Sequence, residues 1–256
     1  MDTRRSKLIV GCLMVGPLAL IGCGDNNRSE PSVDARPAPG MPDAGAVDAS
    51  VCPEAEDLWD DIDIESFTAL AELAELDIAE DVTLADAADY WELRRSTVGA
   101  TDFTALLSTG DKCATAADAE ACEMEFDNLS SEEGFGPTCV EEEEDCFHYI
   151  AVNRGDTNEI IAAPDDLVTF LGTIDTPTEA AMVAFAHEYE WDIDGGDEPA
   201  TGGVRATDDG YELIVTELVQ SCEPVVRERV LLTVSSEGEV SDTRRQVFSA
   251  ACDECL

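Results

Sequence analysis

Basic residues are scarce in this sequence of 256 residues. Lysine and arginine together number 14, against 58 aspartates and glutamates, and the formal net charge is −44 at pH 7. Contacts to nucleic-acid phosphates need clustered cations, so this balance excludes nucleic acid as a partner. Only Lys7 and Lys112 represent lysine. Many carboxylates with little lysine suit a salty environment, because counterions screen the repulsion between like charges.

Catalytic motifs are missing as well. The chain has no Gly-x-Ser-x-Gly elbow for a nucleophilic serine and no glycine loop that would cradle phosphate. Its two histidines are His148 and His187. The stretch His187-Glu188-Tyr189-Glu190-Trp191 begins like the zinc-hydrolase motif His-Glu-x-x-His, but Trp191 takes the place of the second zinc ligand. A hydrolase would have to use two of the many carboxylates, and no pair stands out.

Long apolar runs are also lacking beyond the first residues, so no later segment is long enough to span a bilayer. The apolar run at residues 8–21 follows Arg4, Arg5 and Lys7. A basic start, a short apolar core and then small residues are typical of a secretory signal peptide. We therefore expect residues 1–22 to be a removed signal segment and the protein to be exported.

The run Leu20-Ile21-Gly22-Cys23 resembles a bacterial lipobox. The resemblance implies that Cys23 becomes the lipidated first residue of the mature chain, so that its lipid makes the membrane a partner. The alternative is a plain signal peptide that is cut near Gly22 and leaves Cys23 unmodified. Gly24 follows Cys23 where an aspartate would stand in some lipoproteins, and by resemblance to better-known lipoproteins this favours the outer membrane.

Cysteine is plentiful. Eight of the ten cysteines remain once the signal segment and the lipidated Cys23 are set aside, and an even number in an oxidising compartment predicts four disulfides. The short loops Cys113/Cys122 and Cys139/Cys146 are the natural local pairings, and a bridge between Cys222 and Cys252 is sterically reasonable. The eight cysteines are Cys52, Cys113, Cys122, Cys139, Cys146, Cys222, Cys252 and Cys255.

The rest of the chain divides by composition. Residues 23–52 hold four prolines and almost nothing apolar, which predicts a disordered linker. Residues 53–138 are predicted to be helical, because Ile64, Phe67, Leu70 and Leu73 recur at three-residue steps. Residues 139–256 are predicted to form an α+β domain. The fold class expected is thus α+β, with a helical N-terminal half packed on a disulfide-bonded C-terminal sheet.

Within residues 139–256 the pattern predicts a hairpin, two helices and a four-stranded antiparallel meander. Asn153-Arg154-Gly155-Asp156-Thr157-Asn158 marks the hairpin turn, which explains Arg154-Gly155-Asp156 without an adhesion receptor. Thr176-Pro177-Thr178-Glu179 is the strongest helix start, with an N-cap, a proline at the first position and a glutamate at the third. The meander follows at residues 203–249.

This layout is similar to that of uncharacterised secreted lipoproteins of gliding delta-class bacteria. The likeness covers about residues 110–256 and is carried by the turn at residues 153–156, the run at residues 170–180 and the ending from Tyr211 onward. It implies no activity.

For an acidic exported protein the candidate cofactor is calcium, which binds six to eight oxygen ligands. Residues 192–198 alternate carboxylates with glycines, although the spacing does not match a helical calcium loop. A looser calcium site or a solvated loop are the two interpretations. The candidate ligands are Asp192, Asp194, Asp197 and Glu198.

Five arginines fall in the meander, and they favour cross-strand ion pairs over an anion site. They are Arg205, Arg227, Arg229, Arg244 and Arg245, beside Glu212, Glu217, Glu228 and Glu239.

Taken together, the sequence favours a lipid-anchored cell-envelope protein that acts as a non-catalytic binding or structural module with an unidentified protein or envelope partner. A calcium-dependent adhesion protein is the first alternative, and an extracytoplasmic hydrolase that uses carboxylates is the second.

Overall fold

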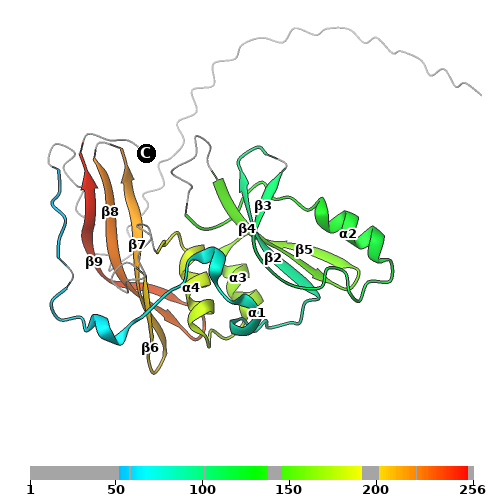
Figure 1. Ribbon diagram of the computed structural model, residues 1–256, viewed down its shortest axis with the longest axis horizontal. Coiled ribbons are helices and arrows are strands. Elements are labelled where there is room, and N and C mark those ends of the chain that lie inside the picture. The colour runs from blue at the N-terminus through cyan, green and yellow to red at the C-terminus, as the bar shows by residue number, and fades with distance from the viewer. Residues whose placement is uncertain are drawn as a thin grey trace, which may run out of the picture. The chain divides into compact units, whose positions relative to one another are not determined.

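The computed structural model describes residues 52–57, 59–100, 102–137, 146–191, 202–222 and 224–252. The expected signal segment, the linker, Cys23, Cys139, Cys255 and the acidic loop at residues 192–198 lie outside these ranges. Two antiparallel sheets and a few short helices make up the described part of the chain (Figure 1).

The first sheet has five strands in the order β1-β6-β7-β8-β9. The order β6 to β9 is that of the predicted meander, which is confirmed. The strands are β1 (Thr68–Ala69), β6 (Gly203–Ala206), β7 (Gly210–Ser221), β8 (Val225–Ser235) and β9 (Val240–Ala251).

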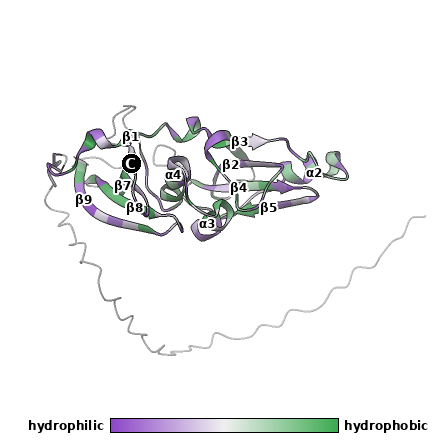
Figure 2. Ribbon diagram, turned by 90° about the horizontal axis from the view of Figure 1, so that it is seen from below, coloured by the Kyte–Doolittle hydropathy of each residue, from purple (hydrophilic) through white to green (hydrophobic). Residues whose placement is uncertain are grey.

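The second sheet has four strands in the order β3-β2-β4-β5, as Figure 2 shows. The predicted hairpin is its β4–β5 pair, and the strands are β2 (Tyr90–Thr97), β3 (Phe103–Gly110), β4 (Cys146–Arg154) and β5 (Thr157–Ile161).

Four α-helices and two 3-10 turns complete the described elements. They are η1 (Ile64–Ser66), η2 (Leu73–Glu75), α1 (Ile78–Asp81), α2 (Ala119–Asp127), α3 (Pro164–Leu171) and α4 (Pro177–Ala186). The capping box predicted for α4 is confirmed: the Thr176 hydroxyl accepts a hydrogen bond from the Glu179 N–H at 3.1 Å, and the Thr176 N–H donates to Glu179 Oε2.

The expectation of a helical N-terminal half is wrong. Residues 90–110 form β2 and β3, and α2 is the one longer helix in the described part of residues 53–138. In β2, Trp91 and Leu93 face one side and Glu92 and Arg94 the other, and all four are buried. A strand covered on both faces shows no alternation between apolar and exposed residues, so its sequence does not carry the pattern that marks a strand.

The main core lies around α4, which Figure 1 and Figure 2 both place between the two sheets. Every residue from Thr178 to Ala186 is buried, as expected for a helix that is apolar on all sides and has neighbours all round. One cluster of buried side chains joins Trp91 and Ile150 of the second sheet to Leu213 and Leu232 of the first. The two sheets therefore share a single hydrophobic core.

Residues 52–57 and 59–67 run along the first sheet and contact the side that faces away from α4. The Glu56 N–H donates to the Val247 carbonyl at 2.8 Å, which covers the edge strand β9. Phe67 then packs on Ile214 and Leu231 in a second apolar cluster, with Trp59, Ile62 and Ile64 around it. The three-residue periodicity at residues 64–73 thus belongs to an extended segment with 3-10 turns, part of which packs on the sheet.

Two disulfides are described in full. The predicted Cys113–Cys122 bridge is confirmed, with Cα atoms 6.0 Å apart. Cys252, however, pairs with Cys52 (Cα atoms 5.6 Å apart) and not with Cys222. The start of β8 lies between the ends of β7 and β9, so Cys222 and Cys252 are separated by two strand spacings, roughly 10 Å, which is too far for a bridge. Cys146 and Cys222 are disulfide-bonded as well.

No helix in the described ranges has the length and apolar character that a membrane crossing requires.

The two described disulfides should stabilise the fold by very different amounts. Cys52–Cys252 spans 200 residues of sequence and Cys113–Cys122 spans 9. Because the loop entropy that a cross-link removes from the unfolded chain grows with the logarithm of loop length, we expect the double variant Cys52→Ser/Cys252→Ser to lose about 3 kcal/mol more than Cys113→Ser/Cys122→Ser. Urea unfolding of both variants measures the difference. Equal losses would contradict it.

Candidate functional site

The predicted calcium ligands lie outside the described residues, so the calcium site stays a prediction. Within the described ranges, no group of three or more histidine, cysteine, aspartate or glutamate side chains is placed to hold a metal ion.

The two histidines occupy different environments. His187 is exposed just after α4. His148 is buried in β4, with its ring edge-to-face on Phe185 at 4.8 Å between ring centroids. Its Nδ1 atom is buried and has no hydrogen-bond partner. Burial, with added repulsion from Arg95, lowers the pKa of His148 to about 4. His148 is therefore a neutral core residue at neutral pH.

Arginines of the meander form ion pairs, and the predicted partners Glu212, Glu217 and Glu228 are among those found. Arg205 pairs with Glu212 on the neighbouring strand, and Arg227 lies 2.7 Å from Glu190. The guanidinium of Arg229 lies over the Phe248 ring, 4.7 Å from the ring centroid. The remaining ion pairs are Arg244 with Asp61, and Arg245 with Glu217, Glu228 and Asp242.

One buried carboxylate could suggest acid catalysis, but its contacts give it another role. Glu179 is fully buried, and burial raises its pKa against the opposing effect of backbone N–H donors. Its oxygens accept from the N–H groups of Thr83, Asp175 and Thr176 at 2.8, 2.9 and 3.2 Å. The Glu179 carboxylate is not accessible to solvent, so its role is structural: it joins Thr83 to the start of α4.

The Arg154-Gly155-Asp156 turn is bound to its own protein. Asp156 Oδ1 accepts from the Ala117 N–H at 2.7 Å, and the Gly155 N–H donates to Asp89 Oδ2 at 3.0 Å. Arg154 pairs with Glu159 of β5. Hydrogen bonds to Thr115 and Gly155 lower the pKa of Asp89. The tripeptide thus acts as a turn, and it fixes the tip of the β4–β5 hairpin.

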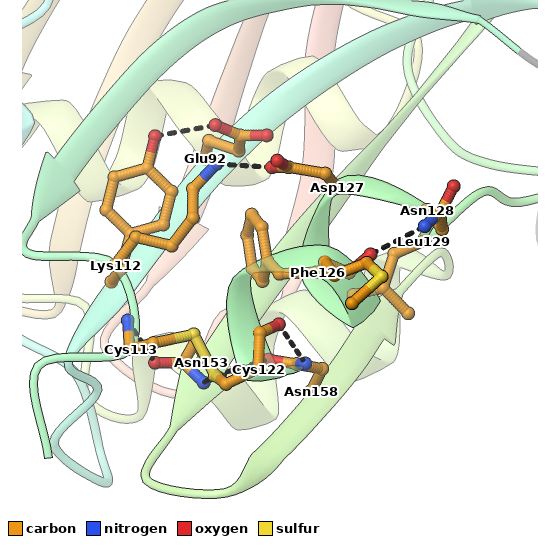
Figure 3. A network of polar contacts seen from close by, with 12 residues as sticks. Glu92, Lys112, Cys113, Cys122, Phe126, Asp127, Asn128, Leu129, Asn153 and Asn158 are labelled. Carbon is orange, nitrogen blue, oxygen red and sulfur yellow. Dashed lines mark hydrogen bonds and ion pairs between the residues drawn. A yellow bond between two sulfur atoms is a disulfide. The ribbon is translucent and has the colours of Figure 1, made fainter. Parts of the chain in front are cut away.

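Polar contacts place α2 on one face of the second sheet, and Figure 3 shows some of them, including the ion pair of Lys112 with Asp127 of α2. Arg94 is fully buried and donates from Nε to Glu92 Oε1 at 2.6 Å. Its remaining nitrogens donate to the carbonyls of Leu129 and Phe126, at 2.5 and 3.2 Å, at the end of α2. These carbonyls carry the partial negative charge of a helix C-terminus, so a cation suits them.

The same network binds the hairpin to α2. Asn153 is fully buried; its Oδ1 accepts from the Cys113 N–H and its Nδ2 donates to Asn158 Oδ1, both at 2.9 Å. Asn158 in turn donates to the Cys122 carbonyl at 3.2 Å, beside the Cys113–Cys122 bridge (Figure 3). Backbone, amide and disulfide together make this corner rigid.

The strand held in this way, β5, is an outer strand of its sheet. Arg154 pairs with Thr157 across a two-residue turn, and hydrogen-bonded and non-bonded pairs then alternate along the hairpin. The N–H and C=O groups of Asn158 and Ile160 therefore point away from β4. In the part of the chain that the structure describes, no strand pairs with them.

A hollow lies on each side of this open edge. The first, about 750 Å³, is bounded by α2 and the hairpin tip at residues 156–158. The second, about 700 Å³, is bounded by α3, by residues 85–87 and by Ile160 and Ile161 of β5.

The two hollows belong to opposite faces of the sheet. Arg94 and Glu92 face α2, whereas the adjacent Trp91 contacts Phe170 of α3, with ring centroids 5.7 Å apart. Neighbouring residues of a strand point to opposite faces, so α2 and α3 cover different sides. The open edge of β5 with its two hollows is the candidate functional site.

Sequence reasoning did not find this site. The turn at residues 153–158 predicted the hairpin, but it gave no sign that β5 ends the sheet or that helices leave hollows beside it. Both facts depend on long-range packing.

No family model, curated protein or solved structure matches this chain.

His148 predicts a specific acid sensitivity. The unfolded chain protonates this histidine near pH 6.5, but the folded protein does so only near pH 4. Between these values the unfolded state binds more protons, so stability falls as pH falls, by about 3 kcal/mol in total. We expect His148→Phe to lose correspondingly less stability between pH 6.5 and pH 4 in urea unfolding.

His187 provides the comparison, because its side chain is more exposed than that of His148, although partial burial lowers its pKa too. The variant His187→Gln should keep most of the wild-type pH slope. An unchanged slope in His148→Phe would show that carboxylates alone cause the acid loss.

Proposed function

We propose that this protein is a lipid-anchored, non-catalytic binding module that captures an extended polypeptide segment at the open edge of β5. The observation that carries the proposal is the pair of free backbone positions, Asn158 and Ile160, between two hollows.

Strand addition accounts for each part of the site. An extended peptide can form main-chain hydrogen bonds with the outward groups of β5, while its side chains alternate between the two faces. The alternate side chains then enter the hollows by α2 and α3. Backbone pairing supplies affinity in such complexes and the pockets supply specificity.

The edge is also preorganised. Asn153, Asp89 and the Cys113–Cys122 bridge hold the hairpin tip before any partner arrives. A segment that binds a rigid edge loses its own conformational entropy but requires little further ordering of the protein.

The sequence supports the setting of this module. The lipobox-like run ending at Cys23 would provide the anchor, and residues 24–51 would hold the module away from the membrane. The disulfides fit export to an oxidising compartment. Gly24 favours the outer membrane as the site of the anchor.

Selection from a library of random ten-residue peptides on the immobilised full-length protein tests the proposal. The variant Ile160→Pro removes one outward N–H without touching the bonds to β4, and proline is tolerated at such edge positions. We expect peptides selected on the wild-type protein to bind Ile160→Pro at least tenfold more weakly and Ile160→Val about equally.

The peptide can be changed as well, which avoids any doubt about folding of the variant. Methylation of alternate backbone nitrogens should abolish binding when it removes the N–H groups that face β5. Binding that survives both the proline and the methylation would refute strand addition at this edge.

A further inference from the structure

We infer that the captured segment carries one apolar and one basic side chain at sequence positions that differ by an odd number, such as i and i+3, with the apolar one in the hollow by α2 and the basic one in the hollow by α3. This inference rests on the proposed strand addition and adds the chemistry of the partner.

The hollow by α2 suits an apolar side chain. Its apolar lining consists of Ala121, Met124 and Leu129, and Met124 is 60% exposed, a high value for a large apolar residue of this protein. The polar residues that complete the lining are Glu125, Asn128, Asp156, Thr157 and Asn158. A thioether side chain is flexible and polarisable, so it adapts to apolar groups of different shape. Exposed apolar surface of this kind gains free energy when a partner covers it.

The hollow by α3 suits a cation. Asp86, Glu159 and Asp166 line it, and among its described lining residues Arg154 is the one cation. Arg154 pairs with Glu159. Asp86 and Asp166 form no ion pair with any residue of the described ranges, and both are exposed. Arg154 Nη2 donates to the Asp86 backbone carbonyl at 3.4 Å, not to its carboxylate. A Lys or Arg of the partner would therefore meet two carboxylates that are not engaged in ion pairs within the described ranges.

The whole chain adds a long-range attraction. A net charge of −44 repels acidic segments and steers basic ones toward the surface, an effect that salt weakens.

The odd spacing follows from geometry. Side chains of an added strand alternate between faces, and the hollows lie on opposite faces of the sheet. Residues at positions i and i+1, or i and i+3, therefore enter different hollows. Residues at positions i and i+2, or i and i+4, point to the same face. A peptide with even spacing can fill only one hollow with its matching side chain.

Two synthetic peptides of identical composition test this inference. Both are ten-residue, end-capped, Ser/Thr-rich sequences with one leucine and one lysine, three residues apart in the first and two apart in the second. Fluorescence anisotropy with the full-length protein should show the first binding at least tenfold more tightly. Replacing its lysine by glutamine should remove most of that advantage.

Variants of the protein test whether the basic side chain binds in the hollow by α3. Asp86→Asn/Asp166→Asn should lower the affinity for the odd-spaced lysine peptide several-fold, and it leaves Asp165 in the first turn of α3 to offset the helix dipole. The matched control Asp208→Asn/Glu237→Gln removes the same charge at two exposed positions that line neither hollow, and it should leave the affinity within about twofold.

The outcomes separate the two proposals. Equal affinity for both spacings, with loss of both in Ile160→Pro, overturns the spacing rule and leaves strand addition intact. Equal affinity of the lysine and glutamine peptides overturns the basic class of partner. Binding that Ile160→Pro does not weaken overturns this inference and the proposed function together.

Discussion

Glu179 joins segments of the chain that lie far apart in the sequence. Its carboxylate accepts hydrogen bonds from the N–H groups of Thr83, Asp175 and Thr176, which ties the chain before β2 to the start of α4. Burying a charge is costly unless donors replace the water that it loses. Three backbone donors provide that replacement, so α4 begins at a defined place and can act as the central element on which both sheets pack.

Arg94 is a second buried charge, and it lies on the other face of the second sheet. Its guanidinium is fully buried, and its partners are Glu92 and two carbonyls at the end of α2. The rings of Phe103 and Phe126 lie 3.7 and 4.8 Å from it, so its remaining surface meets aromatic faces. In both cases a buried charge satisfies backbone groups that would otherwise be unpaired at the end of an element. These two residues set the positions of α2 and α4, and through the shared core that of α3.

Local signals in the sequence predicted the elements whose causes are local. The capping box at Thr176 and Glu179 and the turn around Gly155 depend on neighbouring residues, and α4 and the β4–β5 hairpin lie where they were expected. β2 depends instead on pairing with β4, more than fifty residues later, and its buried charged face removed the alternation that marks a strand. Cys252 illustrates the same limit. Its partner is Cys52 because residues 52–57 lie against the edge of β9. The spacing of cysteines along the sequence does not indicate this contact.

The candidate site could not be predicted from the sequence either, because it also depends on long-range strand pairing. Its chemistry depends on the excess of acidic residues, which the sequence shows directly. An open sheet edge ordinarily invites a second copy of the chain to pair with it. In this protein β9, one of the two outer strands of the first sheet, accepts a backbone hydrogen bond from Glu56, while β5 is left open beside Asp86 and Asp166. Two copies that approached through β5 would bring these carboxylates together, and the net charge would oppose the contact. The acidity that prevents self-association at this edge is thus also the property that selects a basic segment.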